Sequence, residues 1–405
     1  MSSCDLRKSG KWVSWRAPTL LATALTLASS GLVQKYAGLP GVAIHFVLAL
    51  LVISTAKHFL PAVATWMEKL NYWPAIAFLT ISALLFAIVY PMEDSGKFGK
   101  SSDRDDGLNI AASRLLDGES PYYPSHPKAG PLSPLPGAIF IAIPFVILGN
   151  SALQNIFWLA ALVAVGYRYF GKRVLAVFLP ALMLGLSPSI AHEFLIGGDL
   201  IANAIYVPLA FLFVMETWGK ASSHPILKFT SGLALGIALA SRPNFLLLLP
   251  LLSAWLWSAR DFKSAFSASL LSAVVSILIT VPFYFNDPGG FTPLIARQKL
   301  TSIDGLIPHA STAALITTFI ALGTAVILTL RKKKVCQPAF FKLCALITFT
   351  PLIVMMILIS IAKRGLDFSF YIERFGVMPI VFVILGWGME IMNRQAGTSP
   401  AGHHH

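Results

Sequence analysis

The densest group of chemically active side chains in this sequence is a run of four charged residues, Asp103-Arg104-Asp105-Asp106. Three of the four are carboxylates, and the chain around them is apolar. Because an isolated charge in hydrocarbon costs several kcal/mol, this run has to lie where water reaches it. A carboxylate in such a place is a candidate general base. Clustered carboxylates can also hold a divalent cation, although this spacing is weak support for a metal site.

The aspartates also have a structural explanation. A short helical pattern over 109–116 follows them and stops at Gly118. Negative charge is favoured in the first turn of a helix, so capping is the alternative role for Asp105 and Asp106. Asp103 precedes the expected cap, and capping explains it less well.

Polar residues return in later loops, at 190–203, 241–244, 285–309 and 363–374, with acids early in the chain and bases late. This division suits sugar transfer from a phosphorylated lipid, because a carboxylate deprotonates the acceptor while Arg and Lys stabilise the departing phosphate. The expected phosphate-binding residues are Arg242, Arg297, Lys299 and Arg374. The expected substrate-binding residues are Arg104, Asn109, Tyr122, Tyr123, His192, Asp199, Asn203 and His309.

Plainer explanations exist for several of these residues. Tyr122 and Tyr123 suit stacking on a sugar, yet aromatic residues are common at the level of lipid head groups for structural reasons. A lone loop histidine such as His192 is more often structural than catalytic. Arg242 lies in an apolar hairpin and needs an anion, which is either phosphate or a partner carboxylate such as Asp106.

The elements that position these residues are membrane helices. The 405-residue sequence is 56% hydrophobic and 12% charged, whereas a soluble domain carries about 25% charged residues. The composition predicts one all-α polytopic membrane domain over 1–402, with large outer loops at 92–132 and 285–309. Residues 403–405 look like the remnant of an affinity tag and carry no argument.

The formal charge of +13 does not indicate nucleic-acid binding. The basic residues form short clusters between apolar runs, such as 331–334. Clusters of this kind stay in the cytoplasm beside anionic membrane lipids. The three cysteines, Cys4, Cys336 and Cys344, provide neither a disulfide framework nor a metal-ligand spacing.

Thirteen apolar runs are candidate spans, some of them short. They lie at 17–33, 41–60, 73–91, 133–149, 151–167, 174–189, 200–217, 226–241, 244–258, 265–284, 310–330, 340–362 and 375–392. The first could be a secretory signal, but the many later runs favour a retained helix. The basic clusters at the two ends of the chain agree on topology only if one helix fails to cross between 132 and 168.

The short, proline-rich helix within 131–149 is therefore expected to be re-entrant or interfacial. The alternative is that one of the first two runs does not cross. We expect about twelve spans, with both termini cytoplasmic and the polar loops on the outer side of the membrane.

These features together resemble the GT-C superfamily of membrane glycosyltransferases, and more narrowly the bacterial polyprenol-phosphate-dependent mannosyltransferase-like proteins. The resemblance covers about 75–260 and rests on four features. They are an acidic outer loop after an early span, a small-residue helix ending in Leu115-Leu116-Asp117-Gly118, the proline-rich segment 131–136, and Ser187-Pro188 followed by Gly198-Asp199 and Asn203.

The resemblance implies a GT-C fold, a polyprenyl-phosphate sugar donor, a lipid or glycan acceptor, and inverting transfer on the periplasmic side. It implies a general base among Asp103, Asp105 and Asp106, of which we favour Asp103 or Asp105. Relatives place an aromatic residue shortly after the aspartate, where this chain has Gly107-Leu108-Asn109. An inverting displacement requires no cofactor, and a divalent metal, if used, would lie in the cluster Asp103 to Asp106.

Two other classes compete with a glycosyltransferase. A transporter or lipid flippase would typically show inverted repeats and charged residues in mid-span, whereas the charges here cluster at the ends of the apolar runs. A non-catalytic membrane scaffold explains the hydropathy but not the gathering of polar residues on one side.

Overall fold

The computed structural model describes residues 13–95, 104–123, 129–170, 173–294, 302–331, 335–368 and 372–396, and within these ranges it is helical and forms no strand. The α-helices are α1 (Val13–Lys69), α2 (Trp73–Asp94), α3 (Arg104–Leu116), α4 (Pro136–Ile147), α5 (Gln154–Tyr169), α6 (Arg173–Leu186), α7 (Pro188–Leu195), α8 (Asp199–Trp218), α9 (Pro225–Leu239), α10 (Pro243–Leu246), α11 (Leu249–Ala259), α12 (Phe262–Asn286), α14 (Ala310–Arg331), α15 (Gln337–Ala362), α16 (Ile372–Phe375) and α17 (Ile380–Ala396). Short 3-10 helices are η2 (Ser151–Leu153), η3 (Thr292–Leu294) and η4 (Ser302–Gly305).

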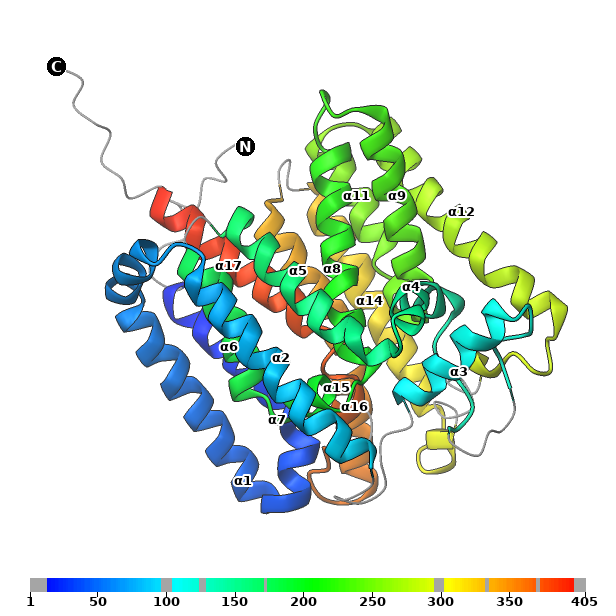
Figure 1. Cartoon of the computed structure of the whole chain (residues 1–405), viewed down its shortest axis with the longest axis horizontal. Helices are drawn as coiled ribbons and strands as arrows, with labels where there is room; N and C mark the ends of the chain where they lie inside the picture. Colours follow the sequence, from blue (N-terminus) through cyan, green and yellow to red (C-terminus); the bar gives the residue numbers. More distant parts are fainter. Residues whose placement is uncertain are drawn as a thin grey trace.

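Helix α1 is a helical hairpin. Its 57 residues would extend roughly 85 Å as one straight helix, against about 30 Å of hydrocarbon in a bilayer. The chain turns back at Gly38, whose φ of 66° is readily adopted only by glycine. Figure 1 shows the two arms meeting at the bottom of the view. The apolar runs 17–33 and 41–60 are therefore separate arms, as their spacing predicts.

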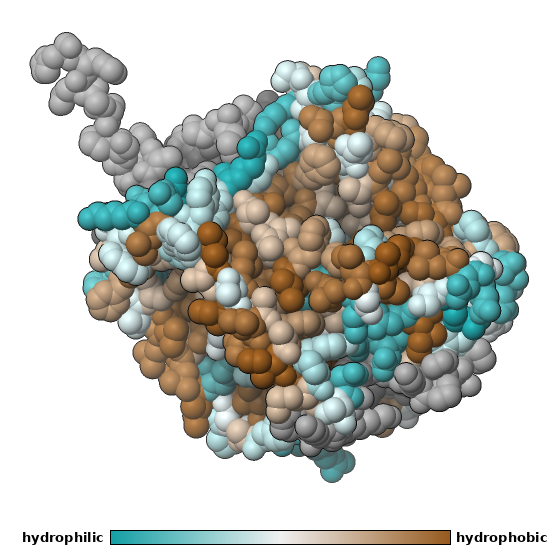
Figure 2. Space-filling model, viewed as in Figure 1, coloured by the Kyte–Doolittle hydropathy of each residue, from teal (hydrophilic) through white to brown (hydrophobic). Residues whose placement is uncertain are grey.

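Helix α8 lies at the centre of the bundle. Its apolar stretch is 78% buried, whereas those of α2 and α12 are 17% and 22% buried. Helices α5, α9 and α17 pack against α8, and Phe211 on α8 is fully buried. Helices α2 and α12 instead expose Leu, Ile and Phe side chains, and Figure 2 shows hydrophobic surface over much of the visible face. Aliphatic surface of this extent is stable against lipid rather than water.

Two helical segments are sharply broken. Helix α4 meets the η2–α5 segment at 102°, and α6 meets α7 at 97°. Helix α4 has 12 residues, too few for a span of about 20, which agrees with a re-entrant or interfacial helix within 131–149. The second bend differs from the expected span 174–189, because α6 ends at Leu186 and α7 begins at Pro188, within that span, and continues to Leu195 in the expected loop 190–203. Proline has no N–H for the preceding turn and favours the start of a new helix.

Helix α1 holds this second bend. His45 Nε2 donates to the Leu186 carbonyl oxygen over 2.8 Å, and the hydroxyl oxygens of Ser29 and Ser187 are 2.6 Å apart. Because Pro188 cannot donate, carbonyl groups at the end of α6 need partners from outside the helix. Inside a membrane such partners have to come from protein, and polar residues of α1 supply them.

The loops rich in polar residues gather at one end of the molecule. Helices α3, α7 and α16 and the Gly38 turn lie at this end, called the α3 end below, whereas the loop between α8 and α9 lies at the opposite end (Figure 1). Within the described ranges, six helices are long and apolar enough to cross a membrane, or eight if each bent pair is one span. That count treats α1 as one helix, although it is a hairpin of two arms. The chain is an all-α polytopic membrane protein, and twelve spans stays a prediction.

Candidate functional site

Asp105 lies at the start of α3 and is 2% exposed. The hydroxyl of Tyr90, near the end of α2, donates to its carboxylate. The Nδ2 group of Asn150 donates in turn to the Tyr90 oxygen over 2.6 Å. Three segments that are distant in sequence therefore meet at one carboxylate, and Tyr90 and Asn150 are site residues that sequence reasoning missed.

The first turn of α3 is anchored on the bend between α4 and α5. The Asn109 side chain accepts from the Ser151 backbone N–H over 2.7 Å, and its Nδ2 donates to Asn150 Oδ1 over 3.2 Å. The Ser151 hydroxyl donates to the Asp105 carbonyl oxygen over 3.3 Å. These contacts give Asn109, an expected substrate-binding residue, the role of joining α3 to the bundle.

The pKa of Asp105 is raised to about 6, mainly by burial and in smaller part by the neighbouring charge of Asp106. The hydrogen bond from Tyr90 and the backbone N–H groups of 105 and 106 oppose the shift. Burial disfavours the charged form of a carboxyl group, while hydrogen-bond donors favour it. The result is a carboxyl group that can gain or lose a proton near neutral pH.

The other members of the acidic cluster are described only in part. Asp106 is half-buried in the first turn of α3, next to Asp105. Asp103 and the side chain of Arg104 lie outside the described residues. The described residues contain no group of three His, Cys, Asp or Glu that could hold a metal ion. Since Asp103 is not among them, the option of a divalent metal at Asp103 to Asp106 stays a prediction.

The loop between α7 and α8 packs directly against Tyr90. A Cβ atom at Gly197 would lie 2.9 Å from Tyr90 Cε2, and the residue has a φ of +73°. A Cβ at Gly198 would lie 2.2 Å from Glu193 Oε2. Gly197 therefore has to be glycine, because of both its φ and its close neighbours, whereas at Gly198 the close atom is the end of the Glu193 side chain. His192 is exposed on α7, whereas Glu193, which sequence reasoning did not select, is buried beside this loop.

A second polar cluster surrounds the start of α8. Arg242 and Asp199 form a buried ion pair, and Arg242 Nη1 donates to Ser133 Oγ over 3.3 Å. Asn203 Nδ2 donates to Asp199 Oδ2 over 3.0 Å, and the Tyr206 hydroxyl donates to Asn203 Oδ1. The expected partner carboxylate of Arg242 is present, but it is Asp199 rather than Asp106.

Backbone contacts set the position of Arg242. The N–H of Leu135 donates to the Ser241 carbonyl over 3.0 Å, and the N–H of Gly137 donates to the Ala240 carbonyl over 2.8 Å. A Cβ at Gly137 would lie 2.2 Å from the Ile237 carbonyl oxygen, so only glycine fits. The start of α4 is thereby clamped to the turn that carries Arg242.

One loop separates the two clusters. Leu132 lies against α3, where its Cδ1 atom would be 3.4 Å from a Cβ at Gly107, and the next residue, Ser133, contacts Arg242. The Thr292 hydroxyl donates to the Leu132 carbonyl over 2.6 Å, which fixes the loop from the other side. The acidic cluster and the Asp199–Arg242 pair are therefore neighbours in one polar region at the α3 end.

Tyr122 and Tyr123, two further residues expected to bind substrate, are buried and do not face a site that is open to a ligand. Tyr122 and Tyr123 are each 5% exposed. The Tyr122 ring packs against Phe283 and Phe291, and its hydroxyl donates to the Pro134 carbonyl over 3.3 Å. Burial raises the pKa of Tyr122 well above its usual value, opposed by the charge of Arg242. The packing of these tyrosines therefore favours a structural role over stacking on a sugar.

Three expected phosphate-binding side chains lie outside the described part of the structure. Arg297 and Lys299 lie outside the described residues, and Arg374 is described only as part of the backbone of α16. His309 is exposed, has a φ of 63°, and precedes α14.

The chain was compared with known proteins. No family model, no curated protein and no solved structure matches it.

Proposed function

We propose that this protein is a GT-C-like glycosyltransferase that moves a sugar from a polyprenyl-phosphate donor to a lipid or glycan acceptor at the periplasmic face of a bacterial inner membrane. The observation that carries the proposal is Asp105, a buried carboxyl group with a pKa of about 6, held by Tyr90 at the start of α3. A general base is most effective when its pKa lies near the working pH. A membrane domain also suits a donor that is itself a lipid.

In the proposed reaction, Asp105 takes the proton of the acceptor hydroxyl while that oxygen attacks the anomeric carbon of the sugar. The bond between the anomeric carbon and the phosphate oxygen breaks on the opposite face, and the electron pair leaves with the phosphate. The sugar configuration is inverted. Cationic side chains stabilise the departing phosphate, and Arg297, Lys299 and Arg374 are the proposed contacts.

Arg242 contributes to phosphate binding only if it exchanges Asp199 for the donor, because the two residues are paired in this structure. The displacement itself requires no metal. A divalent cation held between Asp103 and Asp106 would add positive charge beside the departing phosphate.

The decisive experiment is a transfer assay with the purified protein in lipid, radiolabelled decaprenyl- or undecaprenyl-phosphate sugars, and a membrane extract as acceptor. We expect Asp105→Asn to abolish product. The variants Asp103→Asn and Asp106→Asn identify any other aspartate that is required. Asp117→Asn, an exposed acid at the end of the same helix, is the matched control and should retain activity. Full transfer by all three variants at 103, 105 and 106 would refute the proposal.

A transporter or lipid flippase is the second candidate, and two broken helices beside a buried ion pair favour it. The start of α4, one of the bent helices, is bonded to the turn that carries Arg242, and α7, which follows the other bend, leads into the loop before Asp199. Broken helices often form the substrate sites of transporters. Translocation of a labelled lipid or anion into proteoliposomes, with no chemical change, would establish this function. Product formation that depends on Asp105 would exclude it as the primary activity.

A further inference from the structure

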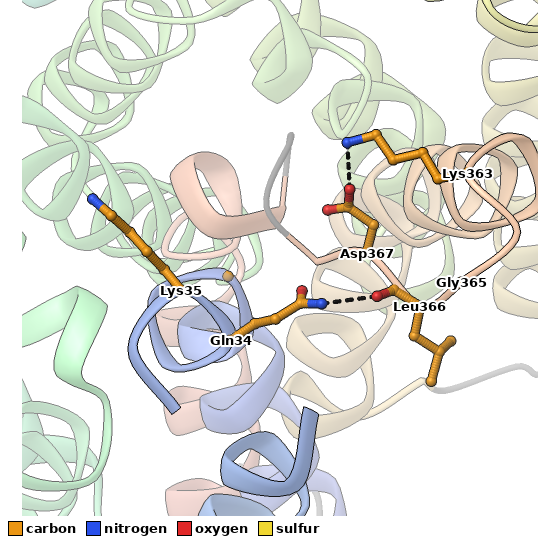
Figure 3. A pocket seen from close by; sticks show the side chains of 7 residues that line it. Gln34, Lys35, Lys363, Gly365, Leu366 and Asp367 are labelled. Carbon is orange, nitrogen blue, oxygen red and sulfur yellow. Dashed lines mark hydrogen bonds and ion pairs between the residues drawn. The ribbon is translucent and has the colours of Figure 1, made fainter. Parts of the chain in front are cut away.

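A cavity of about 390 Å³ opens at the α3 end, between the turn of α1 and the end of α15. Its volume falls in the range of roughly 300–1,000 Å³ that is typical of small-molecule sites. The residues that line it come from two segments, Gly31, Gln34 and Lys35 on α1, and Lys363, Gly365, Leu366 and Asp367 after α15. Figure 3 shows Lys35 on one side of the cavity and Lys363 on the other.

The frame of the cavity is held by hydrogen bonds. Gln34 Nε2 donates to the Leu366 carbonyl over 2.8 Å, and Gln34 Oε1 accepts from the Phe368 N–H over 2.8 Å. The Asp367 N–H donates to the Ser360 hydroxyl over 3.0 Å. One glutamine of α1 therefore fixes the position of the loop after α15.

The charge around the cavity favours an anion. Lys35 and Lys363 line it, Arg364 follows, and all three are exposed, while the single carboxylate is Asp367. Lys363 pairs with Asp367, whereas no carboxylate of the described residues forms an ion pair with Lys35. In the expected topology the α3 end is periplasmic, where Lys and Arg are depleted, so a basic cluster there calls for a partner.

Apolar side chains beside the cavity indicate that the anion belongs to a lipid. Tyr36 is 76% exposed and Leu366 is 58% exposed. Leu366 lines the cavity, and Tyr36 lies beside Lys35, whose amine is 5.2 Å from the centre of the Tyr36 ring. Exposed apolar residues next to lysines suit the boundary between head groups and hydrocarbon, where the aliphatic part of a lysine contacts chains and its amine reaches phosphate.

We propose that this cavity binds the phosphate group of a membrane lipid, with Lys35 and Lys363 as its cationic contacts. On binding, the Lys363 amine turns from Asp367 to the phosphate oxygens, and the lipid chains lie along Tyr36 and Leu366. The site is separate from Asp105 and does not depend on the proposed sugar transfer. Its chemistry would also suit free inorganic phosphate, and the test has to distinguish the two sources.

The test is native mass spectrometry of the full chain in detergent, titrated with phosphatidylglycerol. We expect Lys35→Gln/Lys363→Gln to weaken binding of the first lipid about tenfold, since two charge-assisted contacts are lost. Asp367→Asn should strengthen it several-fold, because the competing carboxylate is removed. Lys69→Gln is the matched control, an exposed lysine on the same helix but at the opposite end. It should leave the first binding step unchanged.

The opposite signs expected for the lysine variants and for Asp367→Asn separate a ligand site from a structural ion pair, which every one of these substitutions would weaken. Unchanged affinity in the double variant, or an equal loss with Lys69→Gln, would overturn the proposal. In a second titration, inorganic phosphate replaces the lipid. Phosphate that displaces phosphatidylglycerol at equal concentration would overturn the lipid assignment and leave a free-anion site, whereas displacement only at far higher concentration supports it.

Discussion

The Tyr90 hydroxyl is oriented so that its hydrogen points at the carboxylate of Asp105. Asn150 Oδ1 accepts from the Ala152 N–H over 2.9 Å, which fixes the orientation of the Asn150 amide and leaves Nδ2 facing Tyr90. Because that amine can only donate, the Tyr90 oxygen accepts from it and has its own hydrogen available for Asp105. Asn150, in the bend between α4 and α5, thus directs the Tyr90 hydrogen toward the Asp105 carboxylate on α3.

Removal of this donor should raise the pKa of Asp105 above its value of about 6, because the Tyr90 hydrogen bond lowers that pKa. In Tyr90→Phe we expect the acidic limb of the pH profile of kcat/KM for transfer to move up by about one pH unit. Activity at pH 8 should be largely retained. Tyr72→Phe, at the other end of α2, is the control, and a limb that stays in place would contradict the assigned hydrogen bond.

The raised pKa of Asp105 makes the stability of the protein depend on pH. The folded carboxyl binds a proton more tightly than the unfolded one, with a pKa of about 6 against 3.8, so wild-type stability falls as pH rises through this window and is lowest above it. Asp105→Asn lacks this fall. Its stability relative to wild type should therefore increase from pH 4 to pH 7, by at most about 3 kcal/mol.

Thermal unfolding in detergent at a series of pH values measures this difference. Asp117→Asn, whose carboxyl is exposed, serves as the comparison and should show no such trend. A stability difference between Asp105→Asn and wild type that is constant with pH would mean that the pKa of Asp105 is not raised in the folded protein.

The ion pair between Asp199 and Arg242 should behave as a unit. Arg242→Met leaves the Asp199 carboxylate buried without its cation, and breaking one partner of a buried pair costs about 3–5 kcal/mol. Asp199→Asn/Arg242→Met should recover most of that loss. The measurement is a double-mutant cycle on thermal unfolding, and strictly additive losses would show that the pair is not coupled.

Transfer activity of the same double variant distinguishes the two roles of Arg242. Activity close to wild type means that the pair is structural. Lost transfer in a variant whose stability is restored supports Arg242 as a contact for the donor phosphate.

Gly137 should not tolerate a side chain. A Cβ there would lie 2.2 Å from the Ile237 carbonyl oxygen, which is backbone and cannot move without separating α4 from α9. We expect Gly137→Ala to cost about 2 kcal/mol or more. In Gly185→Ala, by contrast, the new Cβ meets no atom within 4 Å. That control should be neutral or stabilising by up to about 1 kcal/mol. Similar melting temperatures for the two variants would contradict the close approach of α4 and α9.

Hydropathy predicted the helices well because a lipid-facing helix needs an apolar sequence over its whole length. The runs 73–91, 200–217 and 340–362 correspond closely to α2, α8 and α15. The bend before Pro188 was not predicted, since its stability depends on His45, more than a hundred positions earlier in the chain. The hydropathy of an apolar run gives no information about a hydrogen bond to a residue so distant in the sequence.

The candidate site was predicted less completely, for the same physical reason. Clustered charge in an apolar chain pointed to Asp105, and Arg242 was recognised as needing an anion. The identity of that anion as Asp199, 43 positions away, follows only from how α8 and the 240–242 turn pack. Tyr90 lies within the apolar run 73–91, and its hydropathy pattern gave no reason to separate it from the rest of that span. Tyr122 was assigned to substrate by residue type, whereas its burial depends on Phe283 and Phe291.

The bend between α6 and α7 also sets an order of events during synthesis. Helix α1 emerges from the ribosome long before α6, so His45 and Ser29 are already in the membrane when Leu186 and Ser187 arrive. We therefore expect the first hairpin to serve as a template on which the later break forms. A chain that lacked α1 would present the end of α6 to lipid with unsatisfied carbonyl groups. Supplying α1 as a separate polypeptide in the same membrane would then restore the bend, and with it the Gly197–Gly198 loop that packs against Tyr90.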